Sequence, residues 1–304
     1  MAAPTVDPAN VLTPHPEATR NRVYFKSAAE VAVRALEEEN RIATGMARPL
    51  TWGIPEVDEV VMTMWAGNLT YVVGRPSNGK SMVLLHLARR ECQRLAAEQE
   101  AEREAGIENG PASRQYVAFT CLEDKESSKL AQLTGAPATL AQLMNGQYDR
   151  DAYRRHMLYA AKGWPVWFHG YDQADITTGI VEDLPNLTIE QAYREIRQAE
   201  IDHGLMPSAW FVDYLQLAAS DIEQRSESEE RLRIANVSRQ LKRMARTLNI
   251  PVVCAAQAKQ AVDLRTSLMP AASDIEGSNS PQRDADIILT VWMPRQYSAD
   301  RWAD

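Results

Sequence analysis

The sequence is poor in the residues that would mark a secreted or metal-built protein. It holds only three cysteines in 304 residues, and Cys92, Cys121 and Cys254 stand far apart without a C-x-x-C pair. We therefore expect buried free thiols of a reducing compartment, and neither a disulfide framework nor a zinc site. The five histidines also show no metal-ligand spacing.

Secretion and membrane signals are missing as well. No basic segment followed by an apolar run opens the sequence, so no secretory signal is predicted. No stretch of about 18 apolar residues occurs, so no membrane span is predicted. The net charge is -8, which argues against a generally basic nucleic-acid-coating surface but leaves room for a local basic channel. These absences predict a cytoplasmic globular protein.

One glycine-rich stretch stands out. Residues 74–81 read Gly-Arg-Pro-Ser-Asn-Gly-Lys-Ser and satisfy G-x-x-x-x-G-K-[ST], the phosphate-binding loop of nucleoside triphosphatases. Residues 69–73 before it predict a buried strand, and residues 82–88 after it predict the start of an apolar helix. This context favours a functional loop over a chance match on a surface turn. The predicted nucleotide-binding residues are Gly74, Arg75, Pro76, Ser77, Asn78, Gly79, Lys80 and Ser81.

The chemistry of the loop follows from its residue types. Gly74 and Gly79 let the backbone turn tightly and bring its N–H groups onto phosphate oxygens. The N-terminus of the following helix adds partial positive charge. Lys80 can reach the β- and γ-phosphates, and the Ser81 hydroxyl can ligate Mg²⁺. The stretch therefore predicts a site for a nucleoside triphosphate and Mg²⁺.

Three further predicted strands end in polar residues, namely Glu123, Asp213 and Gln257. The strands are predicted over residues 116–121, 209–213 and 250–256. Open α/β sheets bind ligands at the carboxyl ends of their strands. Asp213 has the form of a Walker B aspartate that delivers a carboxylate to the magnesium shell. A turn-forming aspartate is the alternative, and the upstream loop favours the functional role. The neutral amide of Gln257 could sense the γ-phosphate or position water.

Predicted strands alternate with predicted helices, so the fold class is α/β with a mostly parallel sheet and helices on both faces. We predict a flexible arm over residues 1–26, one helix over 27–44 and a single nucleotide-binding domain over 45–304. The helix either packs on its own core or docks on a neighbouring subunit. Residues 258–283 carry few apolar residues and predict one long loop.

Two later helices complete the prediction. Thr188 can open one helix, which should stop near Gly204. The other follows residue 230 and ends at Asn249. Its predicted buried face is made of Leu232, Ala235, Leu241, Met244 and Leu248.

Taken in order, several blocks resemble the ATPase domain of DnaB-type hexameric replicative helicases, a RecA-like P-loop NTPase fold. The resemblance covers residues 27–293. The similar blocks are Thr51–Asp58, Gly74–Ser81, Phe119–Glu123, Val212–Gln216, Leu241–Ala245, Ile250–Val252, Ala256–Gln257, Ser273–Ile275 and Asp284–Ile288. The helix at 27–44 resembles the linker helix of the family.

The resemblance implies an ATP-dependent helicase or translocase that acts on single-stranded DNA as a ring-shaped homo-oligomer, a hexamer in the family, with a replication or loader protein as a partner. It implies that Lys80 holds ATP phosphates, that Ser81 and Asp213 hold Mg²⁺, and that Glu123 orients and deprotonates the attacking water. Gln257 would couple the γ-phosphate to the DNA-facing loop. The linker helix would dock on the adjacent protomer, which would supply a finger residue.

The DNA-facing loop departs from the family pattern. Where the family usually has Asp-Leu-Arg-Glu-Ser-Gly, residues 274–279 read Asp-Ile-Glu-Gly-Ser-Asn. Glu276 stands in place of arginine and would repel phosphate. The candidate DNA-binding residues that could compensate are Lys259, Arg265 and Arg283.

This departure keeps other functions open. Glu276 and the acidic net charge favour a second hypothesis, a RecA-like regulatory or scaffold ATPase that assembles on ATP and acts on a protein partner. A nucleotide-binding module without hydrolysis is a third hypothesis. It is weakened because both Glu123 and Asp213 are present.

Overall fold

The computed structural model shows a chain that forms two compact units, Met1–Arg48 and Pro49–Asp304. The residues it describes are 27–43, 48–124, 126–139, 142, 145–170, 188–218, 227–265, 267–277 and 279–294. The predicted arm at 1–26 lies outside them. In the first unit, α1 spans Ala28–Ala43, where the sequence predicts a helix. Within this unit the apolar side chains of Val31, Val33 and Leu36 are exposed.

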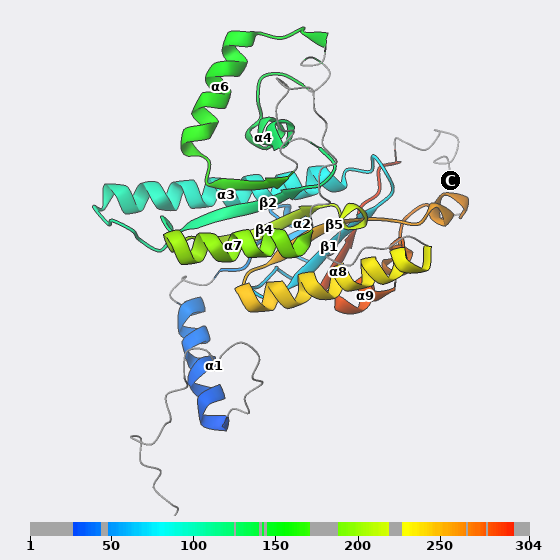
Figure 1. Cartoon of the computed structure of the whole chain (residues 1–304), viewed down its shortest axis with the longest axis horizontal. Coiled ribbons are helices and arrows are strands. Elements are labelled where there is room, and N and C mark those ends of the chain that lie inside the picture. Colours follow the sequence, from blue (N-terminus) through cyan, green and yellow to red (C-terminus); the bar gives the residue numbers. More distant parts are fainter. Residues whose placement is uncertain are drawn as a thin grey trace, which may run out of the picture. The chain divides into compact units, whose positions relative to one another are not determined.

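The second unit is built on one sheet of six parallel strands in the order β3-β2-β4-β5-β1-β6 (Figure 1). The strands are β1 Leu69–Gly74, β2 Gln115–Cys121, β3 Val166–Gly170, β4 Met206–Asp213, β5 Val252–Gln257 and β6 Ile287–Thr290. Central strands such as β1 are buried along their whole length, which explains their nearly continuous apolar sequences. The predicted α/β class is confirmed.

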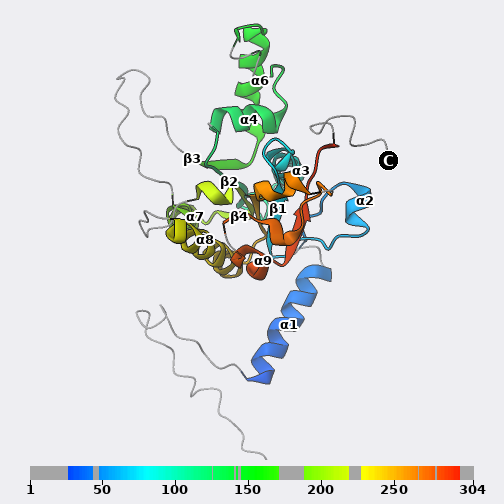
Figure 2. The same ribbon diagram turned by 90° about the vertical axis from the view of Figure 1, so that its right-hand side faces the viewer.

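Helices cover both faces of this sheet, with α3 and α4 on one face and α7 and α8 on the other (Figures 1 and 2). The α-helices of this unit are α2 Pro55–Asp58, α3 Lys80–Glu104, α4 Glu126–Thr134, α6 Arg150–Gly163, α7 Ile189–His203, α8 Glu227–Leu248 and α9 Ser280–Asp284. The 3₁₀ turns are η3 Leu215–Leu217, η4 Gln260–Leu264 and η5 Ala272–Asp274. No helix in the described ranges is long and apolar enough to cross a membrane.

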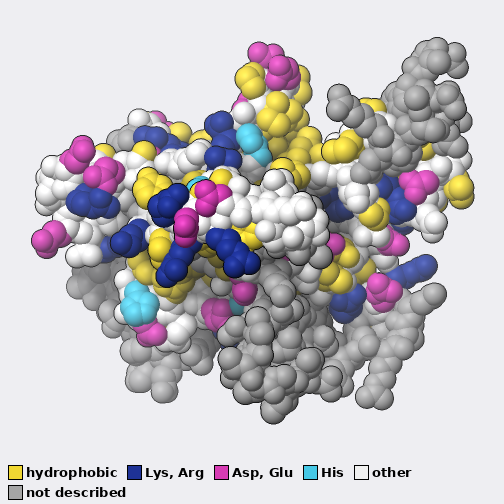
Figure 3. All heavy atoms as spheres, turned by 90° about the horizontal axis from the view of Figure 1, so that it is seen from above, with side chains coloured by type: hydrophobic (Ala, Val, Ile, Leu, Met, Phe, Trp, Pro, Cys, Tyr) yellow, Lys and Arg dark blue, Asp and Glu magenta, His cyan; other side chains and the backbone are white. Residues whose placement is uncertain are grey.

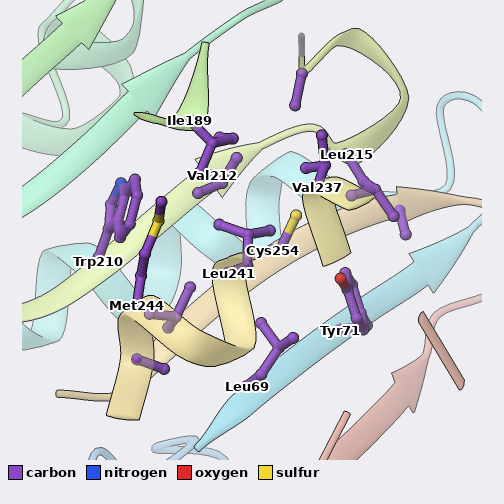
Figure 4. Packing of buried hydrophobic residues seen from close by; sticks show 14 of the residues in the cluster. Leu69, Tyr71, Ile189, Trp210, Val212, Leu215, Val237, Leu241, Met244 and Cys254 are labelled. Atoms are coloured by element: carbon purple, nitrogen blue, oxygen red, sulfur yellow. The ribbon is translucent and has the colours of Figure 1, made fainter. Parts of the chain in front are cut away.

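Alternate residues of the strands enter two separate cores. Tyr71, Trp210 and Cys254 pack with residues of α7 and α8 on one face of the sheet (Figure 4). Their chain neighbours Val72 and Phe211 pack with residues of α3 on the other face. The division follows from the two-residue period of a strand, which sends successive side chains to opposite faces. The three cysteines are buried and free, as the sequence predicts.

The prediction of one long loop over 258–283 is wrong. This segment contains η4, η5 and α9, and an antiparallel bridge pairs Ala258 with Ile275. Its turns are held by polar contacts of Asp274, which accepts from both Nη atoms of Arg265 and from the Ala271 amide. Apolar periodicity is absent from such a segment, so the sequence pattern missed its structure.

One member of the predicted buried face of α8 is also wrong. Leu232 is 60% exposed, whereas Leu241, Met244 and Leu248 are buried as predicted. The buried stripe begins at Ile234, two residues further along the helix. At about 100° per residue this places Leu232 roughly 200° away from the stripe, on the opposite side of α8.

The start of α7 shows how local side chains fix a boundary. The Thr188 hydroxyl accepts from the Gln191 amide, and the Gln191 side chain accepts from the Thr188 amide, forming a capping box. Gly204 ends the helix in the left-handed conformation at φ 65°, as glycine commonly does. Both predicted boundaries of this helix are confirmed.

This cap makes a first testable prediction. Replacing Thr188 by alanine should lower the free energy of unfolding by about 1 kcal/mol, because the Gln191 amide loses its side-chain acceptor and keeps only the Thr188 carbonyl oxygen. Urea unfolding followed by circular dichroism measures the change. Thr247→Ala on the exposed side of α8 is the matched control and should not destabilise, because its hydroxyl bonds only its own helix at Arg243. Equal stability of Thr188→Ala and wild type would contradict the capping role.

Candidate nucleotide site at the strand ends

The register of the sheet brings the predicted site residues to one edge. Gly74, the last residue of β1, pairs with Gln257, the last residue of β5. Asp213, the last residue of β4, pairs with Cys121 at the end of β2. Glu123 follows that strand by two residues. All four strands run in the same direction, so the phosphate-binding loop and the three polar residues lie along the carboxyl edge, where α/β sheets bind ligands.

The loop has the backbone that its glycines permit. Gly79 caps α3 in the left-handed conformation at φ 87°, where a side chain would be strained. A Cβ on Gly74 would lie 2.8 Å from the Val291 side chain and 2.9 Å from its carbonyl oxygen. The two glycines are therefore required for different reasons, one for its dihedral angles and the other for a close approach.

Two side chains of the loop fix its position by bonding to residues outside the loop. The Arg75 Nη1 donates to the carbonyl oxygen of Ala258 at 2.8 Å, and its Nε donates to Asp263 Oδ2 at 2.9 Å. The buried Asn78 accepts from the Met293 amide at 2.7 Å. Arg75, predicted as a nucleotide contact, thus points its guanidinium at η4 and links the loop to the segment that follows β5.

Lys80 and Ser81 begin α3 and face the neighbouring strand ends. The Lys80 Nζ donates to the Arg75 carbonyl oxygen at 3.0 Å, and the Ser81 hydroxyl donates to Asp213 Oδ1 at 3.0 Å. Burial lowers the pKa of Lys80, and the charges of Asp213 and Glu123 partly oppose that effect. Lys80 therefore interacts electrostatically with both acidic residues of the site.

The second oxygen of Asp213 bonds a residue that the sequence did not single out. Lys129 on α4 donates from Nζ to Asp213 Oδ2 at 2.6 Å and contacts Asp124 Oδ2 at 2.8 Å. Burial alone would lower the pKa of Lys129, but the nearby carboxylates outweigh it and raise that pKa. The sequence offers only a weak signal for this role, because Lys129 lies one helical turn before Leu133, which is buried in α4.

Glu123 stands on the turn between β2 and α4. The Leu122 amide donates to the Asp213 carbonyl oxygen at 2.9 Å, which fixes this turn beside the end of β4. The pKa of Glu123 is raised, first by partial burial and then by the charges of Asp213 and Asp124. A carboxylate with a raised pKa and an exposed side chain is suited to accept a proton from water.

Gln257 is tied to the segment that carries Glu276. The Gln257 carbonyl oxygen accepts from the Glu276 amide at 2.8 Å. A second glutamine, Gln216 of η3, accepts from the Gln257 amide at 3.0 Å and donates to the carbonyl oxygens of Gln257 and Glu276, each at 3.3 Å. Gln216 lay in a block used for the resemblance, but its clamping contacts depend on tertiary structure and had no sequence signal.

Two of the three predicted DNA-binding residues come together around Asp274. The Lys259 Nζ donates to the Ser273 carbonyl oxygen at 3.0 Å. Arg265 forms a two-pronged pair with Asp274 at 2.8 and 2.6 Å. Arg283 is exposed on α9, and no contact described for the chain joins it to the other two. The cations predicted to offset Glu276 are thus partly engaged within the protein.

The parallel sheet order, the loop that follows β1, and the carboxylates just beyond β2 and at the end of β4 define the fold of a RecA-like P-loop NTPase. The model of one family, described as the DnaB-like helicase C terminal domain, matches residues 50–303. The chain belongs to this family, and the resemblance inferred from the sequence is confirmed.

Curated relatives and solved structures agree with this assignment. The replicative DNA helicase DnaB of Rickettsia bellii is 27% identical over 251 residues, which are 82% of this chain and 45% of that protein. A probable plasmid replicative DNA helicase of Chlamydia psittaci is 28% identical over 253 residues, 83% of this chain and 48% of that protein. The chain thus spans about half the length of the curated relatives it matches.

Among solved structures, one described as an ATPase domain superposes with a TM-score of 0.66 at 18% identity, covering 90% of this chain and 86% of that chain. A DnaB-like replicative helicase, described together with its interactions with primase, gives a TM-score of 0.63 at 18% identity, covering 90% of this chain and 58% of that one. At these identities the likeness supports the fold.

Proposed function

We propose that the chain is the motor part of an ATP-dependent DNA helicase, which hydrolyses ATP and moves on single-stranded DNA as a ring-shaped homo-oligomer, a hexamer by analogy with the family. The observation that carries the proposal is the arrangement at the carboxyl edge, where the loop, the Ser81–Asp213 pair and Glu123 meet. Membership of the DnaB-like helicase family supports it.

The residues present suit ATP with Mg²⁺. The Ser81 hydroxyl and the Asp213 carboxylate are hard oxygen donors 3.0 Å apart, which is the ligand chemistry that Mg²⁺ prefers. When bound, the ion would neutralise charge on the β- and γ-phosphates. Lys80 and the loop amides would hold those phosphates, Glu123 would orient the attacking water and accept its proton, and Gln257 would respond to the γ-phosphate.

The contacts of Gln257 support a route from nucleotide to DNA. Its backbone is clamped by Gln216 to Glu276, while Arg75 joins the phosphate loop to η4. A shift at the γ-phosphate would therefore reach the 258–277 segment through two sets of contacts.

Partners follow from the same analogy. The exposed apolar residues of α1 support its role as a linker helix that docks on a neighbouring subunit, which would also supply the finger residue. Because a DnaB-like neighbour is described with primase, we include a replication or loader protein among the proposed partners.

The test is the ATPase rate with and without single-stranded DNA, measured beside the mass of the ATP-bound assembly. The proposal expects a ring-sized mass and a rate that DNA raises several-fold, with binding that weakens as salt increases. A rate indifferent to DNA would overturn it.

The second candidate, a regulatory or scaffold ATPase acting on a protein, is favoured by the engagement of Arg265 with Asp274 and by Glu276. Basic and acidic side chains are also intermixed on the face seen in Figure 3. It predicts assembly on ATP with hydrolysis that DNA does not stimulate. Membership of the helicase family makes it the weaker candidate.

Glu276 provides a direct test of DNA contact. Glu276→Arg should bind single-stranded DNA several-fold more tightly and steepen the dependence of log affinity on log salt by about one unit, because a repelling charge becomes an attracting one. Fluorescence anisotropy with labelled oligonucleotide across a salt series measures both. Glu104→Arg, the same charge change at the exposed end of α3, is the control. Equal slopes for the two variants would place DNA elsewhere.

A further inference from the structure

Lys129 is a buried charge that the proposed mechanism does not yet use. Its side chain is 1% exposed, and it lies between Asp213, equally buried, and the partly exposed Asp124. Burying an ammonium group is costly unless it is paired and hydrogen-bonded. The site therefore holds a fixed cation 2.6 Å from the carboxylate of Asp213, one of the two proposed Mg²⁺ ligands.

The contacts of this lysine join Asp213 to Asp124, the residue that follows Glu123 in the chain. Asp213 uses one oxygen for Ser81 and the other for Lys129, so its carboxylate is held at both ends. Asp124 directly follows Glu123, and the Lys129–Asp124 pair joins the Glu123 turn to β4 through a side chain. This adds to the backbone bond from Leu122 to Asp213.

The charge balance gives the lysine more than a packing role. Glu123, Asp124 and Asp213 place three carboxylates at the edge, against the two ammonium groups of Lys80 and Lys129. Without Lys129, three carboxylates would face one lysine. An approaching triphosphate, itself strongly anionic, would then meet uncompensated negative charge unless a divalent cation came with it.

We infer that Lys129 is a positioning residue that acts as a built-in cation, holding Asp213 in place and allowing the triphosphate to bind before a divalent ion arrives. The inference rests on the proposed nucleotide-binding function. On this inference nucleotide binding and metal binding are separable steps. The nucleotide binds the loop while Lys129 balances the charge of Asp213, and the divalent ion then completes the site.

The experiment measures the Kd of a ribose-labelled fluorescent ATP analogue in EDTA and in Mg²⁺, at about pH 8, well above the ordinary pKa of a carboxyl group. Lys129→Met should weaken binding in EDTA roughly tenfold or more, with a change of less than about threefold in Mg²⁺, because the ion replaces the missing charge. Lys242→Met is the matched control, because Lys242 pairs with Asp286 at the opposite ends of the strands. That variant should bind like wild type in both conditions.

Removing one partner of a buried ion pair is strongly destabilising, so Lys129→Met is compared with a double variant in which the charges stay balanced. Lys129→Met/Asp213→Asn keeps the net charge of the site and should bind in EDTA within about threefold of wild type. Asp213→Asn alone keeps the lysine and should bind more tightly in EDTA than the double variant, again by roughly tenfold.

Two results would overturn the inference. One is wild-type affinity of Lys129→Met in EDTA, and the other is equal affinity of Asp213→Asn and the double variant in EDTA. Both leave the proposed function standing, because wild-type binding in Mg²⁺ is measured in the same series. Failure of wild-type protein to bind the analogue in Mg²⁺ would instead overturn the nucleotide-binding proposal itself.

Discussion

Replacing Lys80 by alanine is expected to abolish ATP hydrolysis, with a fall in kcat of at least about 10²–10³. The lysine is buried at the start of α3 and interacts electrostatically with both Asp213 and Glu123. From there its ammonium group would stabilise charge that develops on the β- and γ-phosphate oxygens as the bond breaks. Nucleotide affinity should fall as well, because the same charge attracts the phosphates before reaction.

Steady-state hydrolysis and nucleotide binding by the purified variant test this prediction. Lys162→Ala at the exposed end of α6 is the control, because it removes the same charge far from the loop and should hydrolyse ATP at the wild-type rate. The Lys80 side chain also bonds the Arg75 carbonyl oxygen, so the melting temperature of Lys80→Ala must be compared with wild type. A folded variant that keeps more than about a tenth of the wild-type kcat would contradict the role of Lys80.

The part of the site that could be predicted consists of one contiguous motif and of a strand pattern that recurs along the chain. The phosphate loop is contiguous, and the strands carrying Asp213 and Gln257 are short apolar runs that end in a polar residue. Parallel strands place such ends at one edge whatever their order. A motif and a strand pattern were therefore enough to predict which residues meet, while the pairing of Gly74 with Gln257 needed the sheet order.

The unpredicted part depends on contacts between distant residues. Lys129 and Asp213 are 84 positions apart, and the Arg75–Asp263 contact spans 188. Neither pair leaves a periodic signal, because a single ion pair can be formed by any two elements that meet in space. The same reason explains the 258–283 segment, whose turns are specified by the carboxylate of Asp274 and not by apolar spacing.

Glu123→Gln is expected to separate binding from chemistry. Glutamine has nearly the same shape but cannot accept a proton, so kcat should fall by about 10²–10⁴. Affinity for ATP should stay equal or rise, because a charge that repels phosphate is gone. This differs from Lys80→Ala, in which both quantities fall. Single-turnover hydrolysis together with nucleotide titration distinguishes the two variants.

The pH profile of the wild-type protein adds an independent measure of the same residue. Burial and the charges of Asp213 and Asp124 raise the pKa of Glu123, and a general base works only when it is unprotonated. The hydrolysis rate should therefore fall as pH drops through that raised pKa, at a higher pH than for an ordinary glutamate, while ATP stays bound. Glu108→Gln, an exposed neutralisation beyond the end of α3, should keep both the rate and the profile. Substantial turnover by Glu123→Gln would rule out Glu123 as the group that accepts the proton of the attacking water.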